Sequence, residues 1–115
     1  MSDVLVILCT FPDSEQARQI GTVLVEAQLA ACVNLVPAVE SIYRWQGRME
    51  TTAEVLAIFK TSAAVFPEFE RELAALHPYD VPEIVAIEPA AVSENYASWV
   101  MGSTRDPACG FQRPR

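Results

Sequence analysis

The segment 77–88 carries the densest set of polar and aromatic side chains in this 115-residue sequence, and it begins with His77, the only histidine. Tyr79, Asp80 and Glu83 follow closely. An imidazole can bind a metal ion, and beside a helix end it can equally bond the free carbonyl groups of the last turn. The residue types leave both interpretations of His77 open. We expect a functional site, if the chain has one, to include this segment.

Aromatic and cationic side chains elsewhere in the sequence could line a cleft between subunits. The set comprises Tyr43, Arg44, Trp45, Lys60, Tyr79, Tyr96 and Trp99. Aromatic rings together with a cation suit a small anionic or planar ligand. The same residue types are also common anchors of protein interfaces, and we favour that second interpretation.

Two elements must position His77, a helix before it and a strand after it. The helix is indicated by apolar residues at helical spacing, with Pro67 near its first turn and N-cap chemistry at Thr61 and Ser62; the apolar residues are Phe66, Phe69, Leu73 and Leu76. Pro78 and Pro82 then favour an extended path. The apolar run 84–87 predicts a short buried strand.

The chain opens with a strand and an amphipathic helix. Residues 4–10 are apolar and β-branched on both faces, which is typical of a central strand. Asp13 and Gln16 have the spacing of an N-cap pair. Apolar residues then recur at helical spacing from Ala17 to Ala31, which predicts the first helix.

A long β-hairpin follows. Residues 32–46 look extended throughout and would span roughly 50 Å at about 3.3 Å per residue. Pro37 cannot donate to a sheet ladder, so we expect a bulge or bend there. Residues 46–50 supply the turn, and residues 54–60 return as a buried strand.

The distal half of this hairpin would overhang its own sheet. An unpaired overhang that carries Ile42, Tyr43 and Trp45 is an aggregation hazard, which pairing with another copy of the chain removes. The hydrophobic content of 51% is high for so small a chain and also points to burial between subunits.

The composition excludes several classes of partner. With 8 basic and 15 acidic side chains the net charge is −7, which argues against nucleic acid and membranes as partners. Three cysteines at unrelated spacings form neither a disulfide framework nor a zinc motif, and Cys32 is expected in the core. No leader or membrane-spanning run is visible, so we expect a cytoplasmic protein.

The predicted order is β-α-β-β-α-β with a short further helix capped by Ser93 or Asn95. This order predicts an α+β, ferredoxin-like (split βαβ) antiparallel sheet with two main helices on one face and a short C-terminal helix. The other face must be covered, and we expect a trimer to cover it. The domain is predicted to span 1–104, followed by a flexible tail at 105–115.

Several motifs in order and spacing resemble the CutA divalent-cation-tolerance proteins. They are Ala31-Cys32-Val33-Asn34, Pro37, Ser41-Ile42-Tyr43-Arg44-Trp45-Gln46-Gly47, Glu54, Lys60-Thr61, His77-Pro78-Tyr79-Asp80-Val81-Pro82-Glu83, Tyr96 and Trp99. The match covers about residues 4–102. The resemblance implies a ferredoxin-like homotrimer, a role in tolerance to copper and other divalent metals, copper binding, and no established catalytic activity.

Cys9 and His77 match the family positions proposed as copper ligands, and a thiolate with an imidazole suits copper. Asp80 and Glu83 are possible additional ligands. Cysteine is equally a common small core residue, and we favour that interpretation of Cys9. Some members of the family carry a second histidine at the position of Leu76. The lack of that histidine in this sequence weakens the case for a strong metal site.

Three alternatives remain open at the level of sequence. The first is a small-ligand-sensing signalling trimer resembling the nitrogen-regulatory PII proteins, although no glycine-rich phosphate loop is visible. The second is an enzyme that uses a Cys–His pair, for which no reaction signature is present. The third is a purely structural assembly module.

Overall fold

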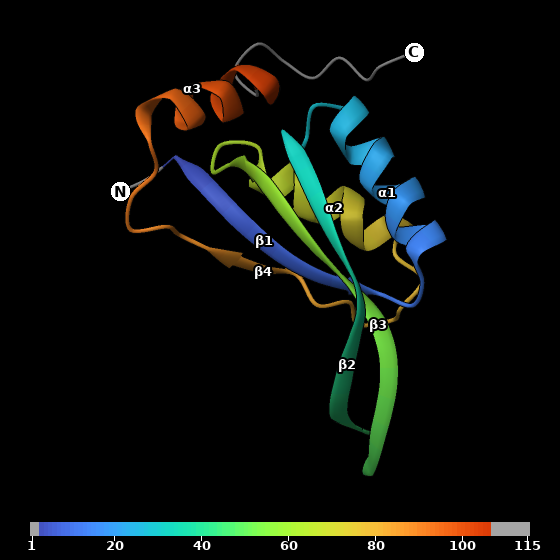
Figure 1. Ribbon diagram of the computed structural model, residues 1–115. Helices are drawn as coiled ribbons and strands as arrows, with labels where there is room; N and C mark the ends of the chain where they lie inside the picture. Colours follow the sequence, from blue (N-terminus) through green and yellow to red (C-terminus); the bar gives the residue numbers. More distant parts are fainter. Residues whose placement is uncertain (1–2, 107–115) are drawn as a thin grey trace.

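The computed structural model describes residues 3–106, which form one four-stranded antiparallel sheet with three helices (Figure 1). The elements are β1 (Val4–Phe11), α1 (Ser14–Glu26), β2 (Cys32–Trp45), β3 (Arg48–Ser62), α2 (Phe66–Leu76), β4 (Val85–Ile87) and α3 (Glu94–Ser103). The strand order is β2-β3-β1-β4. This confirms the predicted α+β fold. No helix within residues 3–106 is long and apolar enough to cross a membrane.

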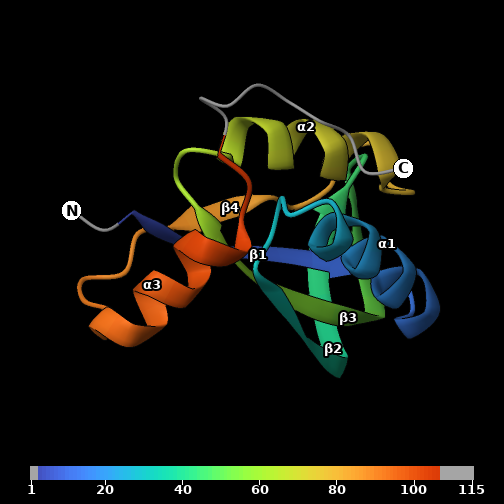
Figure 2. The same cartoon turned by 90° about the horizontal axis from the view of Figure 1, so that it is seen from above.

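One face of the sheet packs against α1 and α2. The core side chains of β1 on this face alternate with side chains on the other; they are Leu5, Ile7, Cys9 and Phe11. They meet Ala17 and Leu24 of α1 and Leu73 of α2. Figure 2 shows α3 apart from α1, beside the N-terminal end of β1.

Helix α1 begins as predicted and ends earlier than predicted. Asp13 is its N-cap, and Oδ1 accepts a hydrogen bond from the Gln16 amide at 2.8 Å. Gln28 then adopts a left-handed φ of 61°, and the amides of Leu29 and Ala30 bond back to the Leu24 carbonyl. This left-handed residue ends the helix, so Ala31 packs in the core without being helical.

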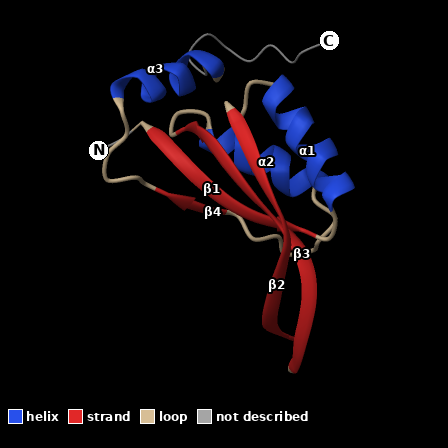
Figure 3. Ribbon diagram, viewed as in Figure 1, coloured by secondary structure: helices blue, strands red, loops and turns tan. Residues whose placement is uncertain are grey.

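Strands β2 and β3 form a long hairpin whose distal half projects beyond the sheet (Figure 3). The register shifts between Val36 and Val39, and Ala38 has a φ of 63°, which confirms the bulge expected at Pro37. The turn is tighter than predicted, with positive φ at Gln46 and Gly47. We call the projecting part, residues 39–54, the arm.

The starts of α2 and β4 differ from the predictions. Thr61 and Ser62 do not cap α2, because they still belong to β3; the N-cap position is Val65, whose amide donates to Ser62 Oγ at 3.4 Å. The Thr61 hydroxyl instead donates to the Leu29 carbonyl. The prediction of a buried strand at 84–87 is also wrong, because β4 pairs with β1 alone and is exposed along its length.

The C-terminal part of the described chain is anchored to the body. Ser93 caps α3, and Val100 packs against Val4 in a second, smaller core cluster. The Arg105 guanidinium bonds the Ala27 carbonyl and Glu68. Arg105 therefore belongs to the folded domain and not to a flexible tail, and the remainder of the predicted tail, 107–115, lies outside the described residues.

Candidate functional site

His77 ends α2 and connects it to β1. Nε2 lies 2.8 Å from the Thr10 carbonyl oxygen, and Nδ1 accepts the Tyr79 amide hydrogen at 3.1 Å. The ring stacks on Phe11 with centroids 4.6 Å apart. This pattern assigns the proton to Nε2 and uses the Nδ1 lone pair. The ring does not bond the free carbonyls of the last turn of α2, which one of the two interpretations of His77 expected, because its partners are the Thr10 carbonyl of β1 and the Tyr79 amide.

Burial fixes the charge state of His77. The imidazole is 7% exposed, and desolvation lowers its pKa, although the Thr10 carbonyl and nearby Glu54 oppose this shift. A neutral ring also matches the hydrogen bonds, because a protonated Nδ1 would face the Tyr79 amide hydrogen. His77 is consequently a neutral connector in this arrangement.

Cys9 lies in the core, as the favoured interpretation of its sequence position predicts. Its side chain is fully buried. Burial, with the negative charges of Glu83 and Glu54, raises the pKa of the Cys9 thiol to about 12. The group is thus a protonated thiol at neutral pH, whereas a metal ligand must be the thiolate.

The arrangement of the single chain does not fit a copper ion held by Cys9 and His77. The thiol is fully buried, and both ring nitrogens of the imidazole already have hydrogen-bond partners. Among residues 3–106, no group of three or more His, Cys, Asp and Glu side chains is placed to hold a metal ion. Asp80 and Glu83, the predicted additional ligands, are exposed on the segment between α2 and β4.

A cleft of about 700 Å³ lies between the arm and the segment after His77; we call it the arm cleft. Its lining consists of Thr10, Ser41, Ile42, Tyr43, Trp45, Glu54, Pro78, Tyr79, Asp80, Val81 and Glu83. Three of the predicted cleft residues, Tyr43, Trp45 and Tyr79, therefore meet within one chain. Lys60 and Arg44 are not among the lining residues.

Glu54 is a functional candidate to which the sequence analysis assigned no role, although it is one of the residues of the family resemblance. It is 7% exposed, and Oε2 accepts a hydrogen bond from the Tyr79 hydroxyl at 2.5 Å. Burial, that bond and the charge of Glu54 raise the pKa of Tyr79 far above its usual value. The available signal was a carboxylate two residues before Leu56 in an apolar strand; its side chain lies on the sheet face away from α1 and α2.

The bulge decides which arm side chains face Glu54. Val36 lies opposite Leu56, but Val39 lies opposite Glu54, so β2 uses one more residue than β3 between these pairs. Residues directly opposite share a face of the sheet. The extra residue therefore turns Tyr43 and Trp45 to the face that carries Glu54.

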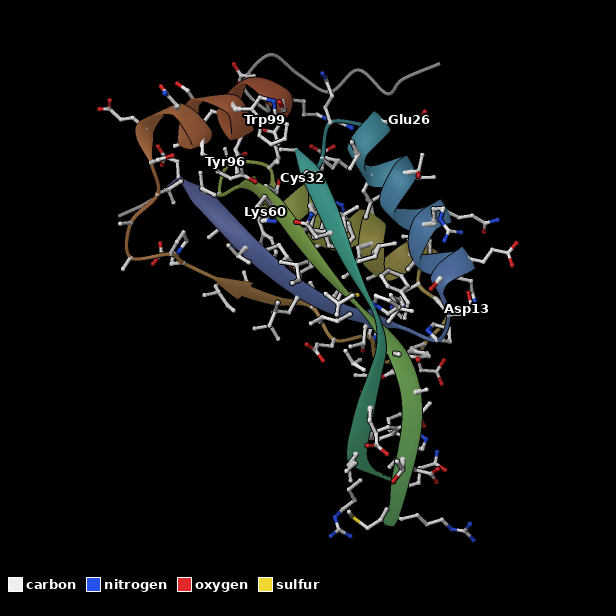
Figure 4. All side chains as sticks on the ribbon, viewed as in Figure 1. Asp13, Glu26, Cys32, Lys60, Tyr96 and Trp99 are labelled. Carbon is white, nitrogen blue, oxygen red and sulfur yellow. The ribbon has the colours of Figure 1, made fainter. Side chains whose placement is uncertain are left out.

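Lys60, Tyr96 and Trp99 of the predicted set gather near α3 (Figure 4), whereas Arg44 lies on the arm opposite Met49. Lys60 donates to Asn34 Oδ1 and lies opposite Cys32 in the sheet. Cys32 is half-buried and not in the core, and its Sγ lies 3.6 Å from the Tyr96 hydroxyl, which raises the pKa of Tyr96 to about 12. The rings of Tyr96 and Trp99 pack together, with their centroids 5.6 Å apart. The predicted set thus divides into two groups of three, and Arg44 belongs to neither.

The comparison with known proteins agrees with this fold and these motifs. The model of the CutA1 divalent ion tolerance protein family matches residues 5–103. A divalent-cation tolerance protein CutA of Thermus thermophilus is 48% identical over 99 residues, which are 86% of this chain and 96% of the relative. The solved Thermus thermophilus Cut A1 structure superposes with a TM-score of 0.86 at 46% identity, covering 89% of this chain and 99% of that one.

A second solved structure is as similar in shape. CutA from Xylella fastidiosa superposes with a TM-score of 0.87 at 40% identity, covering 90% of this chain and all of that one. Both the length of the match and the level of identity exceed what a shared fold alone would require. The chain belongs to the CutA1 divalent ion tolerance family.

Proposed function

We propose that the chain contributes to divalent-cation tolerance as a non-enzymatic homotrimer. The observation that carries this proposal is the apolar surface that a single copy leaves exposed to solvent. Ile42 on the arm is 65% exposed and Met49 is 64% exposed. Large apolar side chains on a projecting hairpin favour pairing with another copy.

The sheet supports the same proposal. Val6 lies opposite Ile87 and Leu8 opposite Val85, so these four residues share the face away from α1 and α2. Val85 is 47% exposed and Ile87 44% exposed. Strand β4 also has no described partner on its outer edge, since it pairs with β1 alone. Neighbouring subunits would cover this face and edge.

Metal binding is part of the proposal on the strength of the relatives, which are named for divalent-cation tolerance. Copper at Cys9 and His77 would need the thiol to lose its proton and the imidazole to leave Tyr79 or Thr10. A third donor would be Asp80, Glu83 or a residue of another copy. Copper binding at these residues would therefore require a change in the arrangement seen in one chain.

The non-enzymatic role is part of the same proposal, and the comparisons do not favour a PII-like sensor. We also propose a cytoplasmic location. Family membership does not fix the compartment, because an Arabidopsis thaliana relative is named as chloroplastic and an Archaeoglobus fulgidus relative as periplasmic.

Subunit mass in solution tests the assembly. Light scattering on the full chain should give about 38 kDa, three times the 12.7 kDa of one copy. Ile87→Glu should lower the mass, because the added charge would lie on the face that subunits cover, and Glu88→Gln is the matched control. A well-folded wild-type monomer at micromolar concentration would overturn the trimer.

Copper titration by calorimetry tests the metal proposal separately. Copper(II) is added to the wild type, to Cys9→Ser and to His77→Gln, with Glu88→Gln as control. Loss of binding in the first two variants, with mass unchanged, supports the proposed ligands. Equal binding in all four proteins would exclude Cys9 and His77 as ligands while leaving the trimer intact.

A further inference from the structure

We propose that the arm cleft binds a small organic cation, an ammonium group carried on a compact apolar skeleton. The proposal goes beyond metal tolerance and does not depend on it. It is argued from the side chains that one copy of the chain contributes to the cleft.

The charge of the cleft sets the sign of its ligand. Glu54, Asp80 and Glu83 line it, and its lining contains no lysine, arginine or histidine. An anionic or phosphate-bearing ligand would meet only like charge there. Lys60, the cation that the sequence analysis placed in a possible cleft between subunits, lies opposite Cys32 in the sheet and does not line the arm cleft of one copy. The same lining attracts a cation.

The size of the cleft points to an organic cation and not to a bare metal ion. Its volume of about 700 Å³ falls within the usual range of small-molecule sites, about 300–1,000 Å³. Its three carboxylates are too dispersed to count as a metal-holding group among residues 3–106. Negative charge spread over such a cleft suits a charge that is itself diffuse and carried on a larger body.

The aromatic lining supplies the second half of the recognition. Tyr43, Trp45 and Tyr79 contribute rings, and a cationic ammonium is attracted to the faces of such rings. Two of these rings are held in place: the Tyr43 hydroxyl lies 3.0 Å from Thr52 Oγ1, and the Tyr79 hydroxyl bonds Glu54. Rings that are already fixed lose little freedom when a ligand binds.

The carboxylates and the aromatic rings of the cleft therefore both favour a ligand that carries an ammonium group. Glu54 lies buried at the base, while Asp80 and Glu83 are exposed. Ile42 and Val81 add apolar surface for the skeleton of the ligand. A quaternary or primary ammonium with a few attached carbons would satisfy all of these groups at once.

The test uses choline as the probe and 3,3-dimethyl-1-butanol, which has the same shape without the charge, as its neutral counterpart. Binding to the assembled full-length protein is followed by calorimetry and by tryptophan fluorescence. Choline should bind and the alcohol should bind at least tenfold more weakly. Equal binding of the two, or stronger binding of inorganic phosphate, would overturn the proposal.

Variants locate the site. Trp45→Leu and Glu83→Gln should weaken choline binding about tenfold, whereas Trp45→Phe should recover part of the loss. Trp99→Leu is the matched control, since Trp99 lies outside the cleft near α3, and Glu88→Gln is the second. Choline affinity that is unchanged in Trp45→Leu and Glu83→Gln would contradict the proposal.

The assembly could also fill the cleft with a segment of another copy. Choline would then fail to bind a protein whose measured mass is that of the trimer, and this result would overturn the ligand proposal alone. A monomeric mass with intact choline binding would overturn the proposed trimer alone. Measuring mass in the same samples keeps the two failures distinguishable.

Discussion

The hydroxyl of Tyr79 donates a hydrogen bond across 2.5 Å to Oε2 of Glu54 and so ties the segment after α2 to the base of the arm. Glu54 is one of few charged groups that the described fold buries. Two residues before Tyr79, His77 bonds the Thr10 carbonyl and accepts the Tyr79 amide hydrogen. These contacts together hold the arm cleft in shape.

Tyr79→Phe should destabilise the fold by about 1–3 kcal/mol. The ring remains, but Oε2 of the buried Glu54 carboxylate loses its donor, and an unsatisfied buried acceptor carries the desolvation penalty. The measurement is urea unfolding at pH 7. Tyr43→Phe is the control, because its hydroxyl pairs with Thr52 on the exposed arm and its loss should cost less than about 1 kcal/mol. Equal losses would show that burial of Glu54 does not matter.

Acidification below about pH 6.5 should destabilise the fold through His77. Burial lowers the folded-state pKa of His77, so the unfolded chain takes up a proton at a pH where the folded chain does not. Protonation therefore favours unfolding. The contribution is fully present above the ordinary imidazole pKa of about 6.5 and is lost as pH falls through the lowered folded value.

Urea midpoints between pH 7.5 and pH 5 measure this effect. The slope should approach at most about 1.4 kcal/mol per pH unit in that window. His77→Gln should flatten the curve above pH 5, because the sequence has no other histidine. A variant with the same slope as the wild type would assign the pH dependence to carboxylates instead.

The long hairpin was predictable because its signals are local. An extended run too long for one sheet, with Pro37 in its interior, requires both a break and an overhang. The structure has the bulge at that point and exposed apolar side chains such as Ile42 beyond it. The predicted N-cap of α1 at Asp13 succeeded for the same reason, since its partner Gln16 is three residues away.

The composition of the cleft was not predictable in the same way. Lys60 and Glu54 lie on one strand, six residues and roughly 20 Å apart, so only one of them can reach the arm cleft. The choice between them depends on the register of β3 with β1 and β2, which no local pattern sets. The contact of His77 with Thr10 and that of Arg105 with Ala27 also join residues far apart in sequence.

Ala38→Gly should stabilise the fold by about 0.5–1 kcal/mol. Ala38 has a φ of 63° at the bulge, a conformation that strains a residue with a Cβ but not glycine. Thermal unfolding measures the change. Ala53→Gly on the neighbouring strand is the matched control and should lower stability, because Ala53 has no positive φ to relieve. A loss in both variants would mean that the bulge is not strained.

Arg105→Ala should destabilise the fold by about 2–4 kcal/mol. The side chain is 8% exposed; Nε and Nη2 donate to the Ala27 carbonyl at 3.1 and 2.7 Å, and Nη1 lies 3.3 Å from Glu68 Oε2. Removing it would leave the end of α1 without its donor and a partly buried carboxylate without its cation. Arg105→Lys should recover only part of the loss, since an ammonium cannot reproduce the planar fork.

Urea unfolding measures both Arg105 variants. Arg71→Ala on the exposed face of α2 is the control and should stay within about 0.5 kcal/mol of the wild type. A chain that ends at residue 104 should be less stable than one that ends at residue 106 by at least the loss in Arg105→Ala, because it also lacks the Arg105 amide that donates to the Gln28 carbonyl. Equal stability of the two shortened chains would contradict the anchoring role of Arg105.

Cys32 should react with iodoacetamide at pH 8 much faster than Cys9 in the native protein. Cys9 is fully buried and has a thiol pKa of about 12, so it offers neither access nor thiolate, whereas Cys32 is half-buried beside Tyr96. Peptide mass spectrometry in a Cys109→Ser background counts the labels at each site over time. In urea both sites should react. Rapid native labelling of Cys9 would contradict this expectation, because it would mean that the core around β1 opens often enough to expose the thiol.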